Sequence, residues 1–255
     1  MQTTVAVLGA GGIGRHHANW WRVEGARVAA ILGRTPESAQ ASADKLRAMF
    51  GFDGAVYTDL GTLLREVRPG IVDICTPASC HAAQALQALQ DGRQVLCEKP
   101  LVFDPALDDA ALLAQAEAVV QMAQAHGLEF GLCSQFSVAA RTCAGLLQAR
   151  GARAPRRIAL ELRSPVRGRA PNPAQTWIDP GPHLVAALQT LLPGRVPDWA
   201  SLQVTAGGHD AVLAFVVPTA DSGSVDVQLA VGFTTGEPAN VRRITLDATT
   251  FDLIG

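Results

Sequence analysis

The sequence predicts a doubly wound α/β domain with a parallel sheet, followed by a smaller α+β domain with an open, largely antiparallel sheet. Two observations support the first domain: short apolar runs alternate with helical stretches, and a glycine-rich turn follows the first run. A third observation supports the second domain: beyond Gly151, turn signals separate the apolar runs and little helix intervenes. We therefore expect domains at residues 1–135 and 136–255.

Six apolar runs in the first domain predict buried strands. Most of them lack polar alternation, as expected for strands of a parallel sheet that helices cover on both faces. The runs are Val5–Leu8, Arg27–Leu32, Ala55–Tyr57, Ile71–Cys75, Gln94–Cys97 and Glu129–Cys133.

Capping residues predict where the intervening helices begin. Thr35-Pro36 is followed by an acid, the pattern of an N-cap, and Asp59 and Ser79 can each cap a further helix. We expect Asp104-Pro105 to open a long Ala/Leu-rich helix that stops at Gly127.

The second domain is expected to begin with a helix over residues 138–149 and a strand over Arg157–Leu162. A Pro/Arg/Gly-rich stretch, residues 164–175, fits no regular element and precedes a short helix over His183–Leu192. The remaining runs predict antiparallel strands over Ser201–Thr205, Ala211–Val217, Val225–Thr234 and Val241–Asp247.

The composition excludes several classes of protein. Of 255 residues, 48% are hydrophobic and 17% are charged, which is enough apolar material for a packed core and unlike a disordered chain. The net charge of -2 argues against nucleic-acid and anionic-membrane partners. No apolar run approaches the roughly 18 residues that span a bilayer, and the N-terminal run lacks the basic flank of a signal peptide. We therefore expect a cytoplasmic protein.

The cysteine pattern predicts reduced thiols. The five cysteines are odd in number, they form no C-x-x-C pair, and three of them fall in predicted strands. This pattern is typical of buried thiols in a reducing compartment, so we expect neither a disulfide framework nor a metal site.

The first strand is followed by a G-x-G-x-x-G motif, Gly9-Ala10-Gly11-Gly12-Ile13-Gly14, and then by a helical stretch. In this context the motif predicts a site for a dinucleotide pyrophosphate. Gly9 permits the tight turn, Gly11 lets a phosphate approach the backbone, and Gly14 lets the helix pack on the strand. The N-terminus of that helix attracts the anion. The alternative interpretation is a plain glycine turn.

The end of the second strand predicts which dinucleotide binds. An acid at this position would hold the ribose 2′-OH of NAD, but the sequence reads Gly33-Arg34-Thr35. The missing carboxylate removes repulsion of a 2′-phosphate, and Arg34 can form a charge-assisted contact with that group. We therefore expect NADP(H) as the preferred cofactor and NAD(H) as the alternative. In the other interpretation, Arg34 is only a solvated residue at a helix start.

Two later strand ends carry polar motifs: Thr76-Pro77, with His81 four residues further on, and Glu98-Lys99-Pro100-Leu101. Ligands bind beyond the carboxyl ends of strands in such sheets, and a Glu-Lys pair there is not ordinary packing material. Together with the glycine motif, these residues resemble the Gfo/Idh/MocA family of NAD(P)-dependent oxidoreductases. Members of that family pair a Rossmann domain with an open-sheet α/β domain.

The resemblance implies roles for these strand ends. Residues 1–135 would form the dinucleotide-binding domain, with Thr76, Pro77, His81 and Glu98 among the cofactor-binding residues. Lys99 would lie beside the nicotinamide and the substrate, and a cis Lys99-Pro100 peptide is compatible with the family pattern. Residues 136–255 would form the substrate and oligomerisation domain.

The family's second signature, D-x-G-x-H, reads Asp179-Pro180-Gly181-Pro182-His183 in this chain. By resemblance, His183 exchanges a proton with the reacting oxygen, Asp179 positions the substrate, and Lys99 polarises the same oxygen. Hydride transfer at carbon requires proton transfer at oxygen, which an imidazole can perform and a nearby ammonium can assist. The alternative for His183 is an ordinary residue at the start of a helix.

The remaining histidines allow fewer conclusions. His81 either approaches the nicotinamide or simply begins a helix. His16 and His17 are expected to pack on the first helix, and His209 is expected to be solvated in a turn. The chain also departs from the family pattern at Ser134-Gln135-Phe136, where an Arg- or Asn-type start is usual.

Six arginines cluster around residues 153–169. Some of them could bind an anionic group of the substrate, or all could form a solvated surface, and both interpretations stay open. The arginines are Arg153, Arg156, Arg157, Arg163, Arg167 and Arg169.

These observations together predict an NADP(H)-dependent oxidoreductase. It would transfer a hydride between nicotinamide and a small hydroxy or carbonyl compound, such as a sugar, a polyol or a related acid. The alternatives are a non-catalytic nucleotide-binding or regulatory protein and an accessory subunit of a hetero-oligomer. An exposed sheet face in the second domain predicts a homo-oligomer, a dimer or a tetramer.

Overall fold

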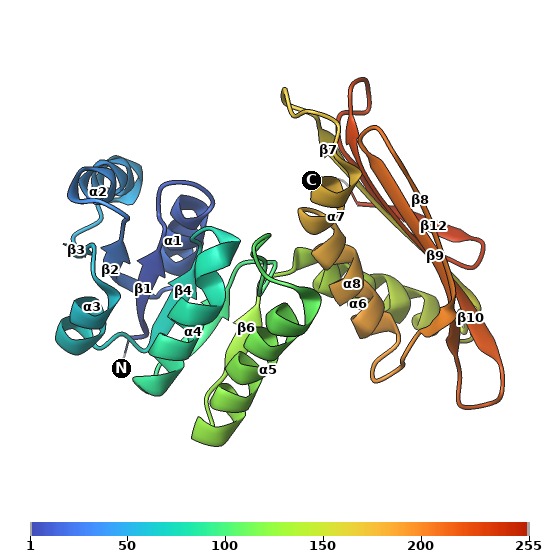
Figure 1. The fold of residues 1–255 in the computed structure, drawn as a ribbon, viewed down its shortest axis with the longest axis horizontal. Helices are drawn as coiled ribbons and strands as arrows, with labels where there is room; N and C mark the ends of the chain where they lie inside the picture. The colour runs from blue at the N-terminus through green and yellow to red at the C-terminus, as the bar shows by residue number, and fades with distance from the viewer. Residues whose placement is uncertain (1, 254–255) are drawn as a thin grey trace. The chain divides into compact units, whose positions relative to one another are not determined.

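A computed structural model describes residues 2–253 and contains two six-stranded sheets (Figure 1). The boundary between two compact units falls between Cys133 and Ser134. Each unit holds one of the sheets and buries apolar side chains of its own. The architecture confirms the predicted fold class, a doubly wound α/β unit followed by a smaller α+β unit.

The first unit is built on a parallel sheet. Its strand order is β3-β2-β1-β4-β5-β6, and all neighbouring strands run parallel. The chain order reverses beside β1, so the carboxyl ends of β1 and β4 border the crevice where such sheets bind ligands. The strands are β1 (Thr4–Leu8), β2 (Arg27–Leu32), β3 (Ala55–Tyr57), β4 (Ile71–Ile74), β5 (Gln94–Cys97) and β6 (Phe130–Leu132).

Helices cover both faces of this sheet, as the continuous apolar runs predict. Val5 and Val7 of β1 pack with α1 and α2, whereas Ala6 and Leu8 pack with α3, α4 and α5 on the opposite face. The helical elements are α1 (Gly14–Val23), α2 (Pro36–Phe50), α3 (Leu60–Val67), the 3-10 turn η1 (Ala78–Cys80), α4 (His81–Gln90) and α5 (Asp109–His126).

Side-chain caps fix two of these helices where the sequence predicts them. The Thr35 hydroxyl accepts a hydrogen bond from the Ser38 backbone N–H at the start of α2, and the Asp59 carboxylate does the same for Thr62 at the start of α3. Each cap satisfies a backbone donor that the first helical turn leaves unpaired. Gly127 ends α5 in the left-handed conformation, also as predicted.

Two predicted helix starts are wrong. Ser79 lies inside η1, and α4 begins two residues later without a side-chain cap. Asp104 does not cap α5, because its carboxylate accepts a hydrogen bond from the Ala106 N–H in a local turn. The N-cap of α5 is Asp108, which accepts from the Ala111 N–H.

The second unit is built on a mixed sheet. Its order is β12-β11-β7-β10-β9-β8; β7 and β10 pair in parallel and all other neighbours pair antiparallel. Apolar residues alternate along β7 and β10, so one face of the sheet packs against α6 and α8. The elements are α6 (Gln135–Ala149), β7 (Arg157–Pro165), α7 (Pro173–Ile178), α8 (Gly181–Leu191), β8 (Asp198–Gly207), β9 (Asp210–Pro218), β10 (Ser224–Thr234), β11 (Val241–Leu246) and β12 (Thr249–Asp252).

Two elements of this unit were not predicted. Helix α7 begins in the Pro/Arg/Gly-rich stretch because Asn172 caps it and Pro173 occupies its first position. Strand β12 follows a tight turn in which Asp247 adopts a φ of 52°, and it pairs antiparallel with β11.

Two further expectations concern the state of the cysteines and the presence of membrane-spanning helices. All five cysteines are free, and Cys75, Cys97 and Cys143 are buried. Within residues 2–253, no helix combines the length and the apolar character needed to cross a bilayer.

Candidate functional site

The glycine-rich turn borders a cavity of about 260 Å³ at the carboxyl end of the first sheet. The cavity walls come from the ends of β1, β2 and β4 and from the first turns of α2. This is the crevice where the order of strands reverses, the ligand position expected of a doubly wound sheet. The predicted cofactor-binding residues among its lining are Gly9, Gly11, Gly12, Gly33, Arg34, Thr76 and Pro77.

The glycines of this turn allow three backbone segments to meet. A Cβ atom on Gly9, whose φ is +85°, would lie 2.7 Å from the Cys75 carbonyl oxygen. A Cβ on Gly14 would lie 2.6 Å from the Gly9 carbonyl oxygen, so α1 could not pack as closely on the turn. A Cβ on Gly11 would meet only the Ser42 hydroxyl, at 3.5 Å, and would otherwise project into open space. The backbone at Gly11 is therefore accessible to an anion, and a pyrophosphate group fits this turn.

Gly33 brings the end of β2 against α2. A Cβ atom at this position would lie 2.6 Å from both the Cα and the Cβ of Ala39. No side chain, and therefore no carboxylate, fits at Gly33 unless α2 moves. The next residue, Arg34, is exposed and lines the cavity. Thr35 caps α2 with its hydroxyl, which is a structural role.

His81 links the ends of two strands. Its side chain is buried at the start of α4, and its ring nitrogens lie 2.7 Å from the Thr76 carbonyl oxygen and 2.8 Å from the Pro100 carbonyl oxygen. The ring therefore supports the loops that follow β4 and β5. His81 therefore begins a helix, as one of its two interpretations predicts, and its approach to the nicotinamide stays a prediction.

The Glu98-Lys99-Pro100 segment leaves the carboxyl end of β5. The Lys99-Pro100 peptide is cis, in agreement with the family pattern. The backbone N–H of Lys99 donates to Oε2 of Glu98 at 3.2 Å, while Oε1 of the same carboxylate lies 3.1 Å from Nε2 of His17. Glu98 is thus held on both sides, and it fixes the backbone from which Lys99 extends.

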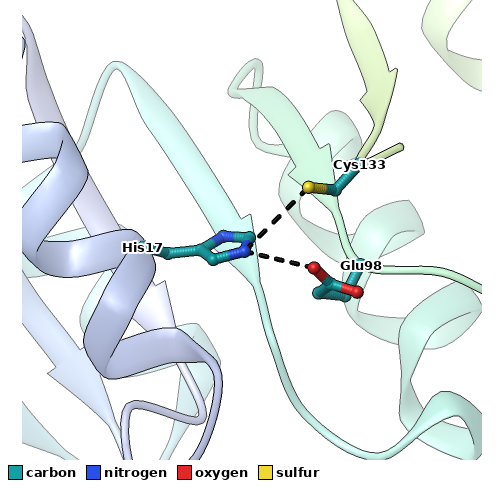
Figure 2. Close-up of side chains that lie close together, drawn as sticks. All are labelled: His17, Glu98 and Cys133. Carbon is teal, nitrogen blue, oxygen red and sulfur yellow. Dashed lines mark hydrogen bonds and ion pairs between the residues drawn. The ribbon is translucent and has the colours of Figure 1, made fainter. Parts of the chain in front are cut away.

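His17 lies in a polar cluster that the sequence did not predict. Figure 2 shows its ring extending from α1 toward Glu98 and Cys133. On the other side of the ring, Nδ1 lies 3.0 Å from Oδ2 of Asp73. Asp73 is fully buried and also accepts a 2.6 Å hydrogen bond from the Trp21 indole N–H. The expectation of ordinary packing for His17 is therefore corrected: the imidazole bridges two carboxylates.

The same contacts set the charges of the cluster. Burial alone would lower the pKa of His17, but its hydrogen bonds, that to Asp73 foremost, outweigh burial and raise the pKa above the ordinary value. Burial alone would raise the pKa of Glu98, but the His17 hydrogen bond and charge outweigh it and lower that pKa. Burial raises the pKa of the Cys75 thiol to about 12 and raises that of Cys97 as well.

The second unit holds the D-x-G-x-H motif where α7 gives way to α8. The Asp179 carboxylate forms a 2.7 Å ion pair with Arg169. His183 occupies the first turn of α8, and its Nδ1 lies 3.3 Å from the Ser134 hydroxyl. Gly181 is required because a Cβ there would lie 2.9 Å from the Trp177 ring. Ser134, noted in the sequence only as a departure, therefore orients the His183 ring.

Three of the six clustered arginines form ion pairs within the second unit. Arg163 pairs with Glu161 and Asp210, Arg156 pairs with Asp221, and Arg169 pairs with Asp179. Their charges are balanced by these partners, which favours a structural role over binding an anionic substrate.

His209 differs from its expected state. Its Nδ1 is buried, and its ring packs edge-on against Phe233 with centroids 6.1 Å apart. The expectation of a solvated turn residue is wrong because the turn folds back onto the sheet.

Comparison with known proteins identifies the family. Residues 3–132 match the GFO_IDH_MocA family, described as an oxidoreductase family with an NAD-binding Rossmann fold. The chain belongs to this family. The match covers the whole parallel sheet, including the glycine turn and the Glu98-Lys99 motif, and it confirms the family resemblance seen in the sequence.

Curated relatives of this Gfo/Idh/MocA chain include several dehydrogenases. An inositol 2-dehydrogenase from Streptomyces avermitilis is 38% identical over 117 residues, which are 45% of this chain and 32% of that protein. A D-glucoside 3-dehydrogenase from Escherichia coli is 32% identical over 103 residues, 40% of this chain and 28% of that protein. The matched part thus spans about a third of the length of these curated relatives.

Solved structures share the fold over nearly the whole Gfo/Idh/MocA chain. A UDP-N-acetylglucosamine 3-dehydrogenase from Acidithiobacillus ferrooxidans superposes with a TM-score of 0.76 at 24% identity, covering 99% of this chain and 77% of that one. A scyllo-inositol dehydrogenase from Lactobacillus casei, solved with bound NAD(H) and scyllo-inositol, gives a TM-score of 0.76 at 17% identity, with coverages of 99% and 76%. Both sheets therefore have counterparts in known proteins.

Proposed function

We propose that this protein is an NADP(H)-dependent oxidoreductase that transfers a hydride between nicotinamide and a small hydroxy or carbonyl compound. The observation that carries the proposal is the cavity at the carboxyl ends of β1 and β4, whose Gly11 backbone is open to an anion, in a chain of an NAD-binding oxidoreductase family. A dinucleotide bound there supplies the hydride donor or acceptor.

NADP(H) rather than NAD(H) is the proposed preference. Gly33 leaves no room for the carboxylate that would hold a ribose 2′-OH and repel a 2′-phosphate. Arg34 lies next to it at the rim of the cavity, where a guanidinium can form charge-assisted hydrogen bonds to a phosphate.

We assign the proton chemistry to Lys99 and His183. An imidazole can exchange a proton with the reacting oxygen, and an ammonium group can stabilise the negative charge that develops on that oxygen. Ser134 orients the His183 ring through Nδ1. Asp179, held by Arg169, positions the substrate hydroxyl groups. Glu98 fixes the backbone of Lys99.

A sugar or polyol is the proposed substrate class. Relatives carry the names inositol 2-dehydrogenase and D-glucoside 3-dehydrogenase, which refer to a polyol and a sugar derivative. The ion pairs of Arg156, Arg163 and Arg169 make a dedicated carboxylate or phosphate subsite at these arginines less favourable. A non-catalytic nucleotide-binding role is not favoured, because the chain retains both Lys99 and His183 and several of its relatives are named as dehydrogenases.

The test is an NADPH oxidation screen over keto sugars, inosose-type ketones, keto acids and semialdehydes, followed by two substitutions. His183→Asn and Lys99→Met should each lower turnover about 100-fold or more on the best substrate, while NADPH binding measured by fluorescence is retained. The controls are His126→Asn, at the exposed end of α5, and Lys45→Met, on the exposed side of α2. Unchanged turnover in both site variants would contradict the roles assigned to Lys99 and His183. Failure of the wild-type protein to bind any dinucleotide would contradict the proposed oxidoreductase function.

A homo-oligomer is the proposed assembly. The helices cover one face of the second sheet, and the other face exposes Glu161, Arg163 and Arg243 beside a depression of about 440 Å³. The edge strand β8 also exposes Trp199 and Val204. Self-association would cover such surfaces. Light scattering of the purified protein tests this, since a monomeric mass would contradict it.

A further inference from the structure

Nε2 of His17 faces possible metal ligands from two other parts of the first unit. Nε2 lies 3.1 Å from Oε1 of Glu98 and 4.0 Å from the sulfur of Cys133 (Figure 2). A ring nitrogen carries either one hydrogen or one lone pair, so it serves one partner at a time. A carboxylate oxygen, a sulfur and an imidazole nitrogen converge here within 4.8 Å of one another.

The other ring nitrogen is arranged as in metal-binding histidines. Nδ1 faces the buried Asp73 carboxylate, which is itself fixed by the Trp21 indole N–H. A metal ion that displaces the proton from Nε2 would leave the other ring hydrogen on Nδ1, where the Asp73 carboxylate holds it. This pairing of carboxylate and histidine recurs behind metal-ligating imidazoles, where it fixes the tautomer and raises the basicity of the ligand.

On these grounds we propose that His17, Glu98 and Cys133 form a binding site for a divalent transition-metal ion of the zinc class. Histidine nitrogen, carboxylate oxygen and cysteine sulfur are together the donor set of zinc, whereas magnesium and calcium take oxygen ligands. A tetrahedral zinc ion with bonds of about 2.0–2.3 Å separates its ligand atoms by roughly 3.3–3.6 Å. The observed separations of 3.1 and 4.0 Å lie on either side of that range, and all three atoms lie within 4.8 Å of one another.

The ion would join three parts of the first unit. His17 comes from α1, Glu98 follows β5, and Cys133 follows β6, with 81 and 116 residues of sequence separating His17 from the other two. This separation explains why ligand spacing along the chain gives no sign of a metal site. Three protein ligands leave a fourth position for a water molecule or another small ligand. Binding would couple to folding, because the three ligands are brought together only in the folded unit.

The site is separate from the dinucleotide cavity. None of the three ligands lines that cavity, and Cys133 is absent from every role assigned above. Glu98 is shared with the proposed catalytic site, because it also fixes the backbone of Lys99. The test of metal binding nevertheless needs no substrate and no cofactor, so its outcome is distinguishable from the outcome of the activity screen.

The experiment is a titration of the metal-free, full-length protein with Co²⁺, followed by displacement with Zn²⁺. We expect saturation at one equivalent, with a thiolate-to-cobalt charge-transfer band in the near ultraviolet and the visible bands of four-coordinate cobalt. Zn²⁺ should abolish these bands and raise the melting temperature. Cys133→Ser should remove the charge-transfer band, and His17→Gln should weaken binding about 100-fold or more, since it removes a ligand and the Asp73 contact together.

Cys80→Ser is the matched control. Cys80 is also free and half-buried, and it belongs to neither group of potential ligands in residues 2–253. The band and the affinity should be unchanged in this variant. If the site variants fold poorly, X-ray absorption of the zinc-loaded wild-type protein tests the ligand set directly. The spectrum should show one sulfur together with nitrogen and oxygen ligands. Absence of saturable binding, a charge-transfer band retained in Cys133→Ser, or a zinc shell without sulfur would each overturn the proposal.

Discussion

Arg34 is the residue on which the proposed cofactor preference depends. It borders the cavity, and its guanidinium could contribute about 1.5–3 kcal/mol to a contact with a 2′-phosphate. Arg34→Ala should therefore raise the KM for NADPH about ten- to a hundredfold and leave that for NADH nearly unchanged. Arg47→Ala is the control, because Arg47 lies on α2, the helix that follows Arg34, and pairs with Asp44 away from the cavity. Equal losses for the two cofactors would contradict the assignment.

Gly9 and Gly12 differ sharply although they belong to one turn. Gly9 combines a φ of +85° with backbone atoms of Cys75 and Thr76 within 3 Å of an added Cβ, whereas nothing lies within 4 Å of one on Gly12. Gly9→Ala should lower the free energy of unfolding by on the order of 3 kcal/mol, through backbone strain and overpacking. Gly12→Ala should be close to neutral. Urea unfolding of both variants measures this, and equal midpoints would show that the contact is absent.

At the scale of single residues, the sequence predicts the packing of the glycines but not the environments of His17 and His209. The local motif that contains Gly9, Gly11 and Gly14 is sufficient to predict why each position needs a glycine. His17 could not be found in this way, because its partners Asp73 and Glu98 are distant in sequence and meet it only after the sheet has formed.

Helix α3 depends on a charged cap. Hydrogen bonds from Thr62 lower the pKa of Asp59 below its usual value of 3.8. A carboxyl group with a lowered pKa in the folded state stabilises the fold above its unfolded pKa, and this contribution is lost as the pH falls through the folded pKa. Acidification below about pH 3.8 should therefore destabilise the wild-type protein more than Asp59→Asn, which keeps an oxygen acceptor but does not titrate. Urea midpoints measured near neutral pH and at about pH 3 compare the two, and parallel pH curves would refute the effect.

The strands of the first unit could be predicted almost to the residue, whereas some helix boundaries could not. Continuous apolar runs identify strands buried on both faces, and β2, β3 and β5 have the predicted bounds. The start of α5 was misplaced because Asp104 and Asp108 are equally good caps in sequence. The two residues differ because the Asp104 carboxylate accepts a hydrogen bond from the Ala106 N–H in a local turn. No sequence motif marks this contact.

The whole molecule contains two units with separate cores. The buried clusters each draw their residues from one side of the boundary after Cys133. NADPH at about 100 times its dissociation constant should stabilise the first unit by roughly 2.7 kcal/mol. Amide hydrogen exchange should slow in the β1, β4 and β5 core and change little in β9 and β10. Equal protection of both sheets would show that the units unfold as one.

Lys99 and His183, the two residues to which we assign the proton chemistry, belong to different units. Each residue could be singled out in its own motif, one in each unit. Each of them has a hydrogen-bond partner within its own unit. Glu98 contacts the Lys99 backbone, and Ser134 contacts the His183 ring. Sequence reasoning could name the residues but not these supports, because Ser134 and His183 are brought together only by the packing of α6 on α8.

The parallel pairing of β7 with β10 has a consequence for synthesis of the chain. All six strands of the first sheet are complete by Leu132, so that sheet can form while the second unit is still being synthesised. In contrast, both neighbours of β7 lie beyond residue 223. We expect β7 to emerge and wait unpaired through translation of some sixty residues, a stage at which its apolar side chains are available to chaperones.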